Sequence, residues 1–312
     1  MVLLQRTVDG LLEAGPYALI GLGLSLGFGV LRRLNLAYGA GAMLAAYLGS
    51  WLHVRWGWSM AGVWLSVIVG TVIAGRYVEW LCFEGPQNPG HAGGHALQRR
   101  QELVGGTDVR EVTALAASFA VWMQLEQLAV NWQPSHVHPF PDLASTSEWS
   151  WASLTLRPDR LAVGVGATVC VMLSAWWMDR SRLGRGLRAV ASQPTAAHLS
   201  GMPVQRLQRM GFALSCVLAG VAACAVLSMD GQVTPMFGMW LLIKGLAVAM
   251  LAGLGQIRRL IPAAMLLGVV EAHTQALWGP VARDAVAWAL LLGALLWQAR
   301  HREGGVSGVV HA

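Results

Sequence analysis

The chain has 312 residues, of which 55% are hydrophobic and only 12% are charged. Soluble domains usually carry about twice that charged fraction because they must cover their surface with polar groups, so this composition excludes an ordinary soluble domain. The formal net charge is +6, but the basic residues stand in short clusters between long apolar runs, which argues against a nucleic-acid-binding domain.

The apolar residues fall into nine helix-length runs. About 20 apolar residues suffice for a helix to cross a bilayer, and the runs lack the alternating pattern of a membrane barrel. The sequence therefore predicts an all-α, polytopic membrane protein with eight or nine crossings, because one run is short and Gly-rich and another contains Lys244. In chain order the predicted spans are Leu11–Leu31, Asn35–Leu52, Trp58–Val78, Val112–Val130, Leu161–Met178, Met210–Met229, Phe237–Leu254, Leu260–Trp278 and Asp284–Gln298.

Two connections between these spans are long. The stretch 79–111 contains PQNPGHAGGH followed by charged residues, and the stretch 131–160 contains PSHVHPFPD, whose prolines exclude a regular helix. Neither is expected to hold a soluble domain of its own. We therefore predict a single transmembrane domain over residues 1–312.

The arginines predict the orientation of the spans. Cytoplasmic loops of membrane proteins carry an excess of Arg and Lys, and the stretch 179–209 holds six arginines against one acidic residue. With that stretch in the cytoplasm and nine alternating spans, 16 of the 21 arginines lie on the cytoplasmic side. This arrangement places the N-terminus and residues 131–160 outside, and residues 79–111 and the C-terminus in the cytoplasm.

The segment Leu183–Phe212 reads LGRGLRAVASQPTAAHLSGMPVQRLQRMGF. Pro194 is suited to the start of a short helical stretch, and Gly201 is suited to its end. Such a basic segment with helix punctuation at both ends predicts a short helix along the membrane surface. The alternative is a solvated basic loop that only fixes the topology.

This segment resembles the cytoplasmic coupling region of the permease subunits of branched-chain amino-acid ABC importers. The family pattern, roughly LGRxxRAxAxxxxxAxxxGI, is matched at Leu183–Arg185, Arg188–Ala189, Ala191, Ala197 and Gly201–Met202. The first two spans, YALIGLGLSLGFGVLRRLNLAYGAGAMLAAYLG, and C-terminal segments around Lys244, Gly253–Gly255, Gly268–Ala272 and Arg283–Val286 are also similar to the family. The chain departs from the pattern at Tyr38, Thr195 and Gln256–Pro262.

The resemblance implies an inner-membrane permease that works by alternating access. Two homologous permeases, expected as a heterodimer, would form the path, two cytoplasmic ATPases would drive it, and an external solute-binding protein would deliver the solute. The chain has no GxxxxGK[ST] motif, so we expect ATP on the partner subunits and neither cofactor nor catalytic residues here. The resemblance assigns ATPase coupling to Arg182, Arg185, Arg188, Ala197 and Gly201.

Lys244, the one lysine of the sequence, lies inside an apolar run. An unpaired ammonium group there costs at least ~2.5 kcal/mol, so Lys244 needs water or a partner, for which Glu271 is the candidate. A structural ion pair and a charge that lines the translocation path are equally open. Asn35 and Tyr38 are further candidates for the path, because they stand at a Gly-rich interruption that is tolerated at membrane depth only where it is packed or lines a cavity.

Two other classes of function compete with an ABC permease. A stand-alone secondary transporter predicts an internal repeat, and the two halves show no convincing similarity. An intramembrane enzyme would need polar groups converging at one depth, whereas the histidines fall mostly in loops. Neither His91 with His95 nor His136 with His138 has a third ligand at a clear spacing, so we expect no metal. The solute stays open between branched-chain amino acids, which the resemblance favours, and amides, urea-like compounds or small carboxylates.

Overall fold

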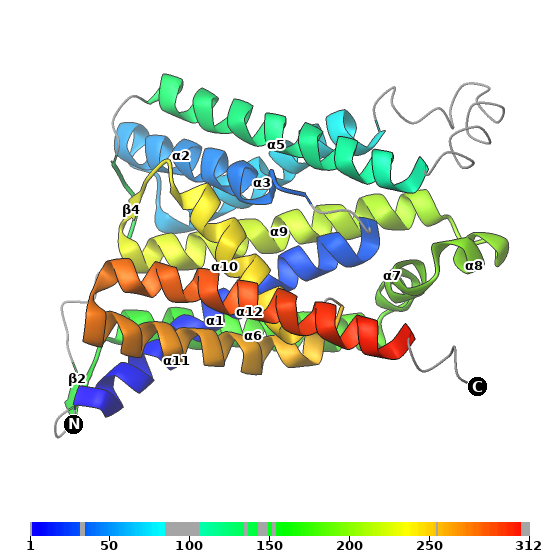
Figure 1. Ribbon diagram of the computed structural model, residues 1–312. Helices are drawn as coiled ribbons and strands as arrows, with labels where there is room; N and C mark the ends of the chain where they lie inside the picture. The colour runs from blue at the N-terminus through cyan, green and yellow to red at the C-terminus, as the bar shows by residue number, and fades with distance from the viewer. Residues whose placement is uncertain are drawn as a thin grey trace. The chain divides into compact units, whose positions relative to one another are not determined.

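The computed structural model describes residues 2–31, 35–84, 106–133, 137–142, 149–151, 154–253 and 255–306. These residues are mostly helical (Figure 1). A π-helical turn, η1 (Trp80–Glu84), continues α3, and a 3-10 turn, η3 (Ile257–Arg259), precedes α11. The α-helices are α1 (Val2–Leu31), α2 (Tyr38–Trp56), α3 (Met60–Glu79), α5 (Gly106–Trp132), α6 (Pro158–Arg180), α7 (Arg182–Ser192), α8 (Pro194–Leu199), α9 (Val204–Asp230), α10 (Phe237–Ala252), α11 (Leu260–Trp278) and α12 (Pro280–Val306).

The predicted all-α, polytopic architecture is confirmed, since each of the nine predicted spans lies largely within one of these helices. Several helices are longer than the apolar runs that predicted them. For example, α1 begins at Val2 rather than at Leu11, and α5 begins at Gly106 rather than at Val112. Hydropathy marks only the hydrocarbon thickness, whereas a helix continues into the polar interface.

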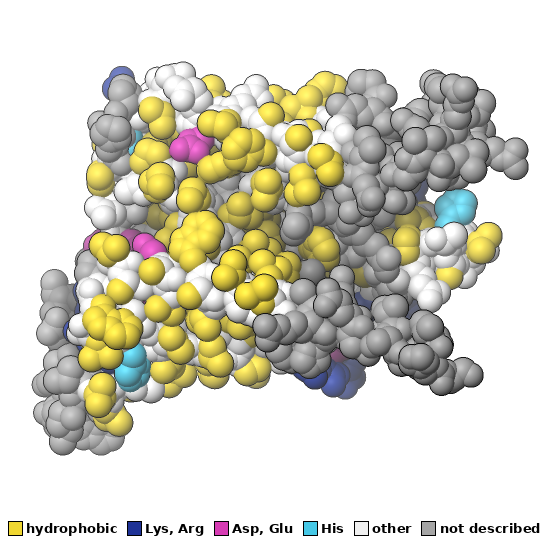
Figure 2. Space-filling model, viewed as in Figure 1, with side chains coloured by type: hydrophobic (Ala, Val, Ile, Leu, Met, Phe, Trp, Pro, Cys, Tyr) yellow, Lys and Arg dark blue, Asp and Glu magenta, His cyan; other side chains and the backbone are white. Residues whose placement is uncertain are grey.

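The surface of the helices is suited to lipid. Hydrophobic side chains cover much of the face drawn in Figure 2. The exposed large hydrophobic residues include Leu65 and Ile73 of α3 and Leu173 of α6, and exposed apolar surface of this kind marks contact with lipid or with another protein. Within the described residues, five helical stretches are long and apolar enough to cross a membrane, and α10 is apolar but shorter. The five are Leu3–Leu31, Met60–Cys82, Pro158–Arg180, Val204–Asp230 and Ile257–Trp278.

The chain divides into two compact units, with divisions inside α1, α6 and α10. Unit 1 comprises Met1–Ser25, Leu143–Trp177 and Ile243–Ala312. Unit 2 comprises Leu26–Asp142 and Met178–Leu242.

Unit 1 is held together where helix backbones approach closely. A Cβ added to Gly10 of α1 would lie 2.6 Å from the Gly268 carbonyl oxygen of α11. Pro16 lacks the N–H that would bond the Leu12 carbonyl, and this carbonyl oxygen would lie only 2.5 Å from a Cβ on Gly164 of α6. Small residues at such crossings let membrane helices pack by van der Waals contact where lipid supplies no hydrophobic driving force.

In unit 2, α2 packs against α3, α5 and α9, and most of its residues are buried. A two-residue strand, β1 (His138–Pro139), pairs antiparallel with β4 (Gln232–Val233). The Ser50 hydroxyl of α2 donates a hydrogen bond of 2.7 Å to the Pro139 carbonyl, which ties the loop after α5 to α2. The prolines of this loop thus favour a short extended pairing rather than a helix.

The remaining strands form a hairpin in the loop before α6. β2 (Trp149–Trp151) pairs antiparallel with β3 (Leu154–Leu156). Because both strands lie between helices that account for the predicted spans, they leave the all-α class of the membrane part unchanged.

Candidate functional site

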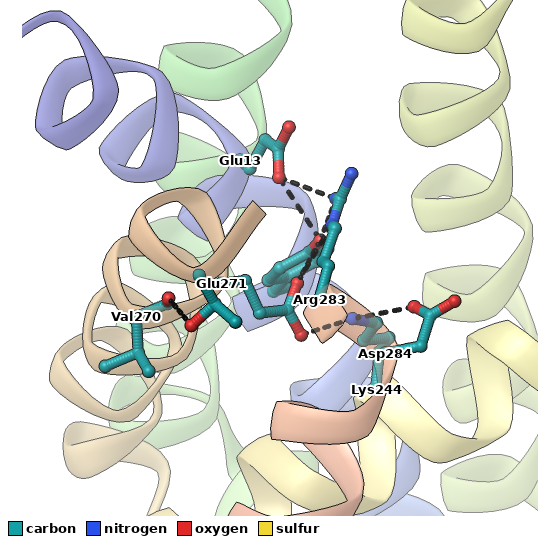
Figure 3. Close-up of polar contacts among 8 residues, drawn as sticks. Glu13, Lys244, Val270, Glu271, Arg283 and Asp284 are labelled. Atoms are coloured by element: carbon teal, nitrogen blue, oxygen red, sulfur yellow. Dashed lines mark hydrogen bonds and ion pairs between the residues drawn. The ribbon is translucent and has the colours of Figure 1, made fainter. Parts of the chain in front are cut away.

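Five charged side chains and one tyrosine meet inside unit 1, and we call this group the charge cluster (Figure 3). At its centre, the Lys244 ammonium group donates to Glu271 Oε1. The side chains of this pair are only 2% and 0% exposed. The structure therefore brings together the two residues that hydropathy singled out. The members are Glu13 and Tyr17 from α1, Lys244 from α10, Glu271 from α11, and Arg283 and Asp284 from α12.

The second carboxylate oxygen of Glu271 is also bonded. Its Oε2 accepts from the Tyr17 hydroxyl at 2.9 Å and from Arg283 Nε at 3.3 Å. A buried carboxylate is tolerated only when its charge is paired and its remaining lone pairs are satisfied. With donors on both oxygens, Glu271 meets that requirement and links three other helices to α11.

Arg283 connects the outer part of the charge cluster. Its Nη2 donates to Glu13 Oε2 at 2.7 Å and to the Tyr17 hydroxyl oxygen at 2.6 Å. The rigid fork of a guanidinium group is suited to such simultaneous contacts. The Tyr17 hydroxyl has a single proton and lies closer to Glu271 than to Glu13, at 2.9 against 3.3 Å. We therefore assign its donated bond to Glu271.

Asp284 is the accessible end of the charge cluster. Its carboxylate lies 3.7 Å from Lys244 Nζ, and 60% of its side chain is exposed. The carboxylate of Asp284 is therefore the group of the cluster that a ligand reaches most easily. The arrangement is chemically able to attract a cationic group at Asp284 while the pair beneath it stays buried.

Four members of the charge cluster were missed by the sequence analysis: Glu13, Tyr17, Arg283 and Asp284. Glu13 lies inside the first predicted span, so the rule that an ionisable residue in an apolar run is functional or paired identifies it as it identifies Lys244. Arg283 and Asp284 stand at the edge of the last predicted span, where charges are common and hydropathy gives no signal.

Asn35 and Tyr38, the other predicted path residues, belong to unit 2 and stand at the start of α2. The Asn35 side-chain oxygen accepts from the Ala37 amide at 3.0 Å, which closes a turn just before the helix. Tyr38 begins α2 and is 5% exposed. Asn35 thus has a local structural role at this helix start, and Tyr38 is buried beside it.

The predicted coupling region forms two short helices, and we call residues 182–202 the coupling segment. Ser181 caps α7, because its Oγ accepts from the Gly184 amide at 2.8 Å. Gly184, Leu187 and Val190 recur every third residue and are buried. The opposite face carries the predicted arginines Arg182, Arg185 and Arg188, all of which are exposed.

In α8, Pro194 and Gly201 stand at the start and just past the end of the helix, as the sequence predicted. Pro194 is its first residue, where the missing N–H has no cost. Gly201 has φ of +75°, a left-handed conformation that favours glycine. The amides of Met202 and Gly201 donate to Ala197 and His198 carbonyls at 3.1 and 3.0 Å, which together form a Schellman cap.

The coupling segment exposes one large apolar side chain beside its arginines. Ala197 is only 4% exposed, so its methyl group packs inside the chain. Leu199 is 84% exposed and is the most prominent apolar side chain of α8. Arg188 forms an ion pair with Asp179. Leu199 gives no signal in the sequence because a six-residue helix is too short for periodicity to show which face is covered.

Of the four histidines considered for a metal, the structure describes only His138. His138 lies in β1 and packs edge-on against Tyr47, with ring centroids 5.0 Å apart. His91, His95 and His136 lie outside the described residues. In the described parts of the chain, no three His, Cys, Asp or Glu residues are grouped in a way that could hold a metal ion.

Comparisons with known proteins place these features in context. The family model for the permease component of branched-chain amino acid transport systems matches residues 6–81 and 99–295. The chain is 25% identical over 301 residues to the high-affinity branched-chain amino acid transport permease BraD of Pseudomonas aeruginosa, covering 95% of this chain and 94% of BraD. It is 24% identical over 305 residues to LivH of Escherichia coli, covering 94% and 92%. The solved structure of PsaBC from Streptococcus pneumoniae in complex with Fab aligns with 13% identity and a TM-score of 0.48, covering 92% of this chain and 90% of that one.

Proposed function

The chain belongs to the family of permease components of branched-chain amino acid transport systems, and we propose that it forms part of the path by which an ABC importer takes up branched-chain amino acids. The family match over most of the chain is the observation that carries this proposal. The apolar helices supply the multi-pass membrane structure that such a path requires.

We propose that the charge cluster lies on the solute path. An amino acid carries an ammonium and a carboxylate group, and the cluster offers groups of both signs at its accessible end, in Asp284 and Arg283. The buried Lys244–Glu271 pair then stays in place beneath the site. If either side chain moved away from the other, both charges would be unpaired in apolar surroundings. This proposal keeps the pair structural and gives the contact with solute to its neighbours.

We propose that the coupling segment docks on a cytoplasmic ATPase. Its support is the exposed Leu199 on a capped, defined helix, beside a face of arginines that the positive-inside rule assigns to the cytoplasm. A second permease subunit, two ATPases and an external binding protein complete the proposed importer. In this scheme ATP binding shifts the permease between its states only through the differential affinity of the docked ATPases for each state.

The test is reconstitution with purified partners. The chain is co-expressed with a second permease and two ATPases, and uptake of labelled leucine is measured in proteoliposomes with the binding protein outside. We expect uptake only when ATP is present in the lumen of the proteoliposomes, on the side of the membrane where the ATPases bind. Uptake that persists without the ATPases and follows an ion gradient would instead assign the chain to secondary transport.

The proposed orientation is tested in intact cells. Single cysteines are introduced at Val137 and Ser192 in a variant that lacks the four native cysteines, and intact cells are labelled with a membrane-impermeant thiol reagent. We expect label at position 137 and none at position 192 until the membrane is opened. The reverse pattern would invert the topology without changing the assignment to the family.

A further inference from the structure

A groove with a volume of about 800 Å³ opens in unit 2 between α3 and α5, with α2 as its floor. Its walls are mainly apolar, and among the described residues that line it none is charged. The polar members are Tyr77 on α3 and Gln124, Gln127 and Asn131 on α5. The groove lies wholly within unit 2 and is unrelated to the charge cluster.

The groove extends over only part of the membrane. On α5 its lining runs from Gln124 to Trp132, which is about 12 Å at 1.5 Å per residue. The hydrocarbon core of a bilayer is about 30 Å thick, so the groove corresponds to roughly one leaflet. At its deep end the Tyr77 hydroxyl donates to Gln124 Oε1 at 3.1 Å, and this bond joins α3 to α5.

The other end of the groove lies at the membrane interface. Trp132 lies there, 5.8 Å from the ring of Trp51, and Trp51 lies 5.6 Å from Trp56. Tryptophan rings favour the headgroup layer of a membrane, so this group marks the interface. Gln127 donates to Asn131 at 3.2 Å close to the same end. The groove therefore combines an apolar interior with amide groups near the interface.

We propose that this groove binds an acyl chain of a membrane phospholipid, taken from the leaflet that contains the C-terminal end of α5. The chain would occupy the apolar part down to the Tyr77–Gln124 bond, and the ester region would meet the amides of Gln127 and Asn131. An acyl chain is apolar and about as long as one leaflet, and the groove has mainly apolar walls and roughly that length. The site thus takes a lipid as a ligand, separate from the transported solute.

Other occupants fit less well. A transmembrane helix of a partner needs about 20 residues and the full 30 Å of the core, whereas the Tyr77–Gln124 bond closes the groove after one leaflet. Ordered water needs two to four polar partners at each position, and most of the lining is apolar. A zwitterionic amino acid would find no charged side chain among the described lining residues.

A matched pair of variants on α3 tests the proposal. Ile73 lines the groove and Leu65 does not, yet both side chains are 64% exposed. Ile73→Trp should fill the groove, whereas Leu65→Trp adds the same ring elsewhere on the helix. Both are purified in mild detergent as full-length chains, and bound phospholipid is counted by native mass spectrometry. Thermal unfolding is then followed with and without added phosphatidylethanolamine.

We expect the unsubstituted protein and Leu65→Trp to retain one phospholipid and to gain thermal stability when phosphatidylethanolamine is added. Ile73→Trp should lose that lipid and most of the gain. Equal lipid retention and an equal gain in all three proteins would overturn the proposal.

A photocrosslink in the membrane identifies the occupant directly. Leu128 lines the groove and is 54% exposed, so p-benzoylphenylalanine in its place would contact whatever fills the groove. Irradiation of membranes that contain the assembled protein should give an adduct with the mass of a phospholipid. A crosslink to another polypeptide, or no lipid adduct above that of the same probe at position 65, would refute a lipid site.

Discussion

The charge cluster and the coupling segment use charge in opposite ways. In the charge cluster, Lys244 and Glu271 are almost inaccessible, and donors on several helices converge on Glu271. In the coupling segment the arginines are exposed, and Arg188 pairs with Asp179 where both side chains are 43% exposed. The first arrangement binds helices to one another, whereas the second contributes little to folding and leaves its surface available to a partner.

This difference indicates which substitutions should affect transport without affecting the stability of the fold. Removal of one member of a buried pair leaves the other member charged and unsatisfied, so folding and transport fail together. Removal of an exposed side chain changes the folded state little, so a loss of activity there reports on a contact with another subunit. The four predictions below test this contrast.

The first prediction concerns Glu271. Glu271→Ala should lower the free energy of unfolding by about 3–5 kcal/mol, because Lys244 would stay buried without its partner. Arg283 and Tyr17 would lose an acceptor as well, and Lys244 would keep only the more distant carboxylate of Asp284, at 3.7 Å. The measurement is unfolding in detergent together with uptake by proteoliposomes. Asp284→Ala is the control for stability alone, since its exposed carboxylate should contribute little to it, and an equal loss of stability in both variants would contradict the contrast.

The second prediction concerns the coupling between Lys244 and Glu271. The double variant Lys244→Ala, Glu271→Ala should be less destabilised than the sum of the two single variants, because no isolated charge remains. Contacting residues typically give interaction energies of about 0.5–3 kcal/mol. A double-mutant cycle on unfolding measures this energy directly. Strictly additive losses would mean that each side chain has a separate role despite the observed contact.

The sequence predicts the helices of this fold well because lipid imposes a length on them. Each predicted span coincides with a helix, and the errors are confined to helix ends. The contact between Lys244 and Glu271 could also be predicted from the sequence. A lone ammonium group in an apolar run requires a partner, and Glu271 stands in the next run.

The rest of the charge cluster depends on tertiary packing. Arg283 contacts Glu13 across 270 residues of sequence, and hydropathy does not reveal that α1 lies beside α12. The backbone contact of Gly10 with Gly268 brings α1 close to α11, and it is equally hidden in a single sequence. In the coupling segment, likewise, helix signals predicted α8 but not that Ala197 faces inward and Leu199 outward.

The third prediction concerns Leu199. Leu199→Asp should lower solute-stimulated ATP hydrolysis roughly tenfold or more, since burial of a leucine at an interface is worth about 1.5–3 kcal/mol and 1.4 kcal/mol corresponds to a factor of ten. Expression and thermal stability should stay near normal, because the side chain is 84% exposed. ATPase activity and co-purification of the ATPases measure the effect.

Leu199 separates docking from folding more cleanly than Ala197 or Gly201. Ala197→Trp would also disturb the packing of α8, because Ala197 is buried. Gly201→Glu would strain the backbone, because position 201 has φ of +75°. Gly201→Asn, which tolerates that conformation, is the matched control for strain. Normal coupling by Leu199→Asp with the ATPases still bound would reduce the coupling segment to a loop that only fixes topology.

The last prediction concerns the exposed arginines and has the smallest effect. Arg185→Ala should weaken coupling by about 0.2–1 kcal/mol, the range for exposed charges, and the effect should fade with salt because screening acts over about 10 Å at 0.1 M. Arg188→Ala should behave similarly but also lose its pair with Asp179. ATPase stimulation is measured between low and high salt for both variants. A loss that persists in Arg185→Ala at high salt would contradict simple screened attraction, since a close, desolvated contact with an ATPase carboxylate is screened much less than an exposed charge pair.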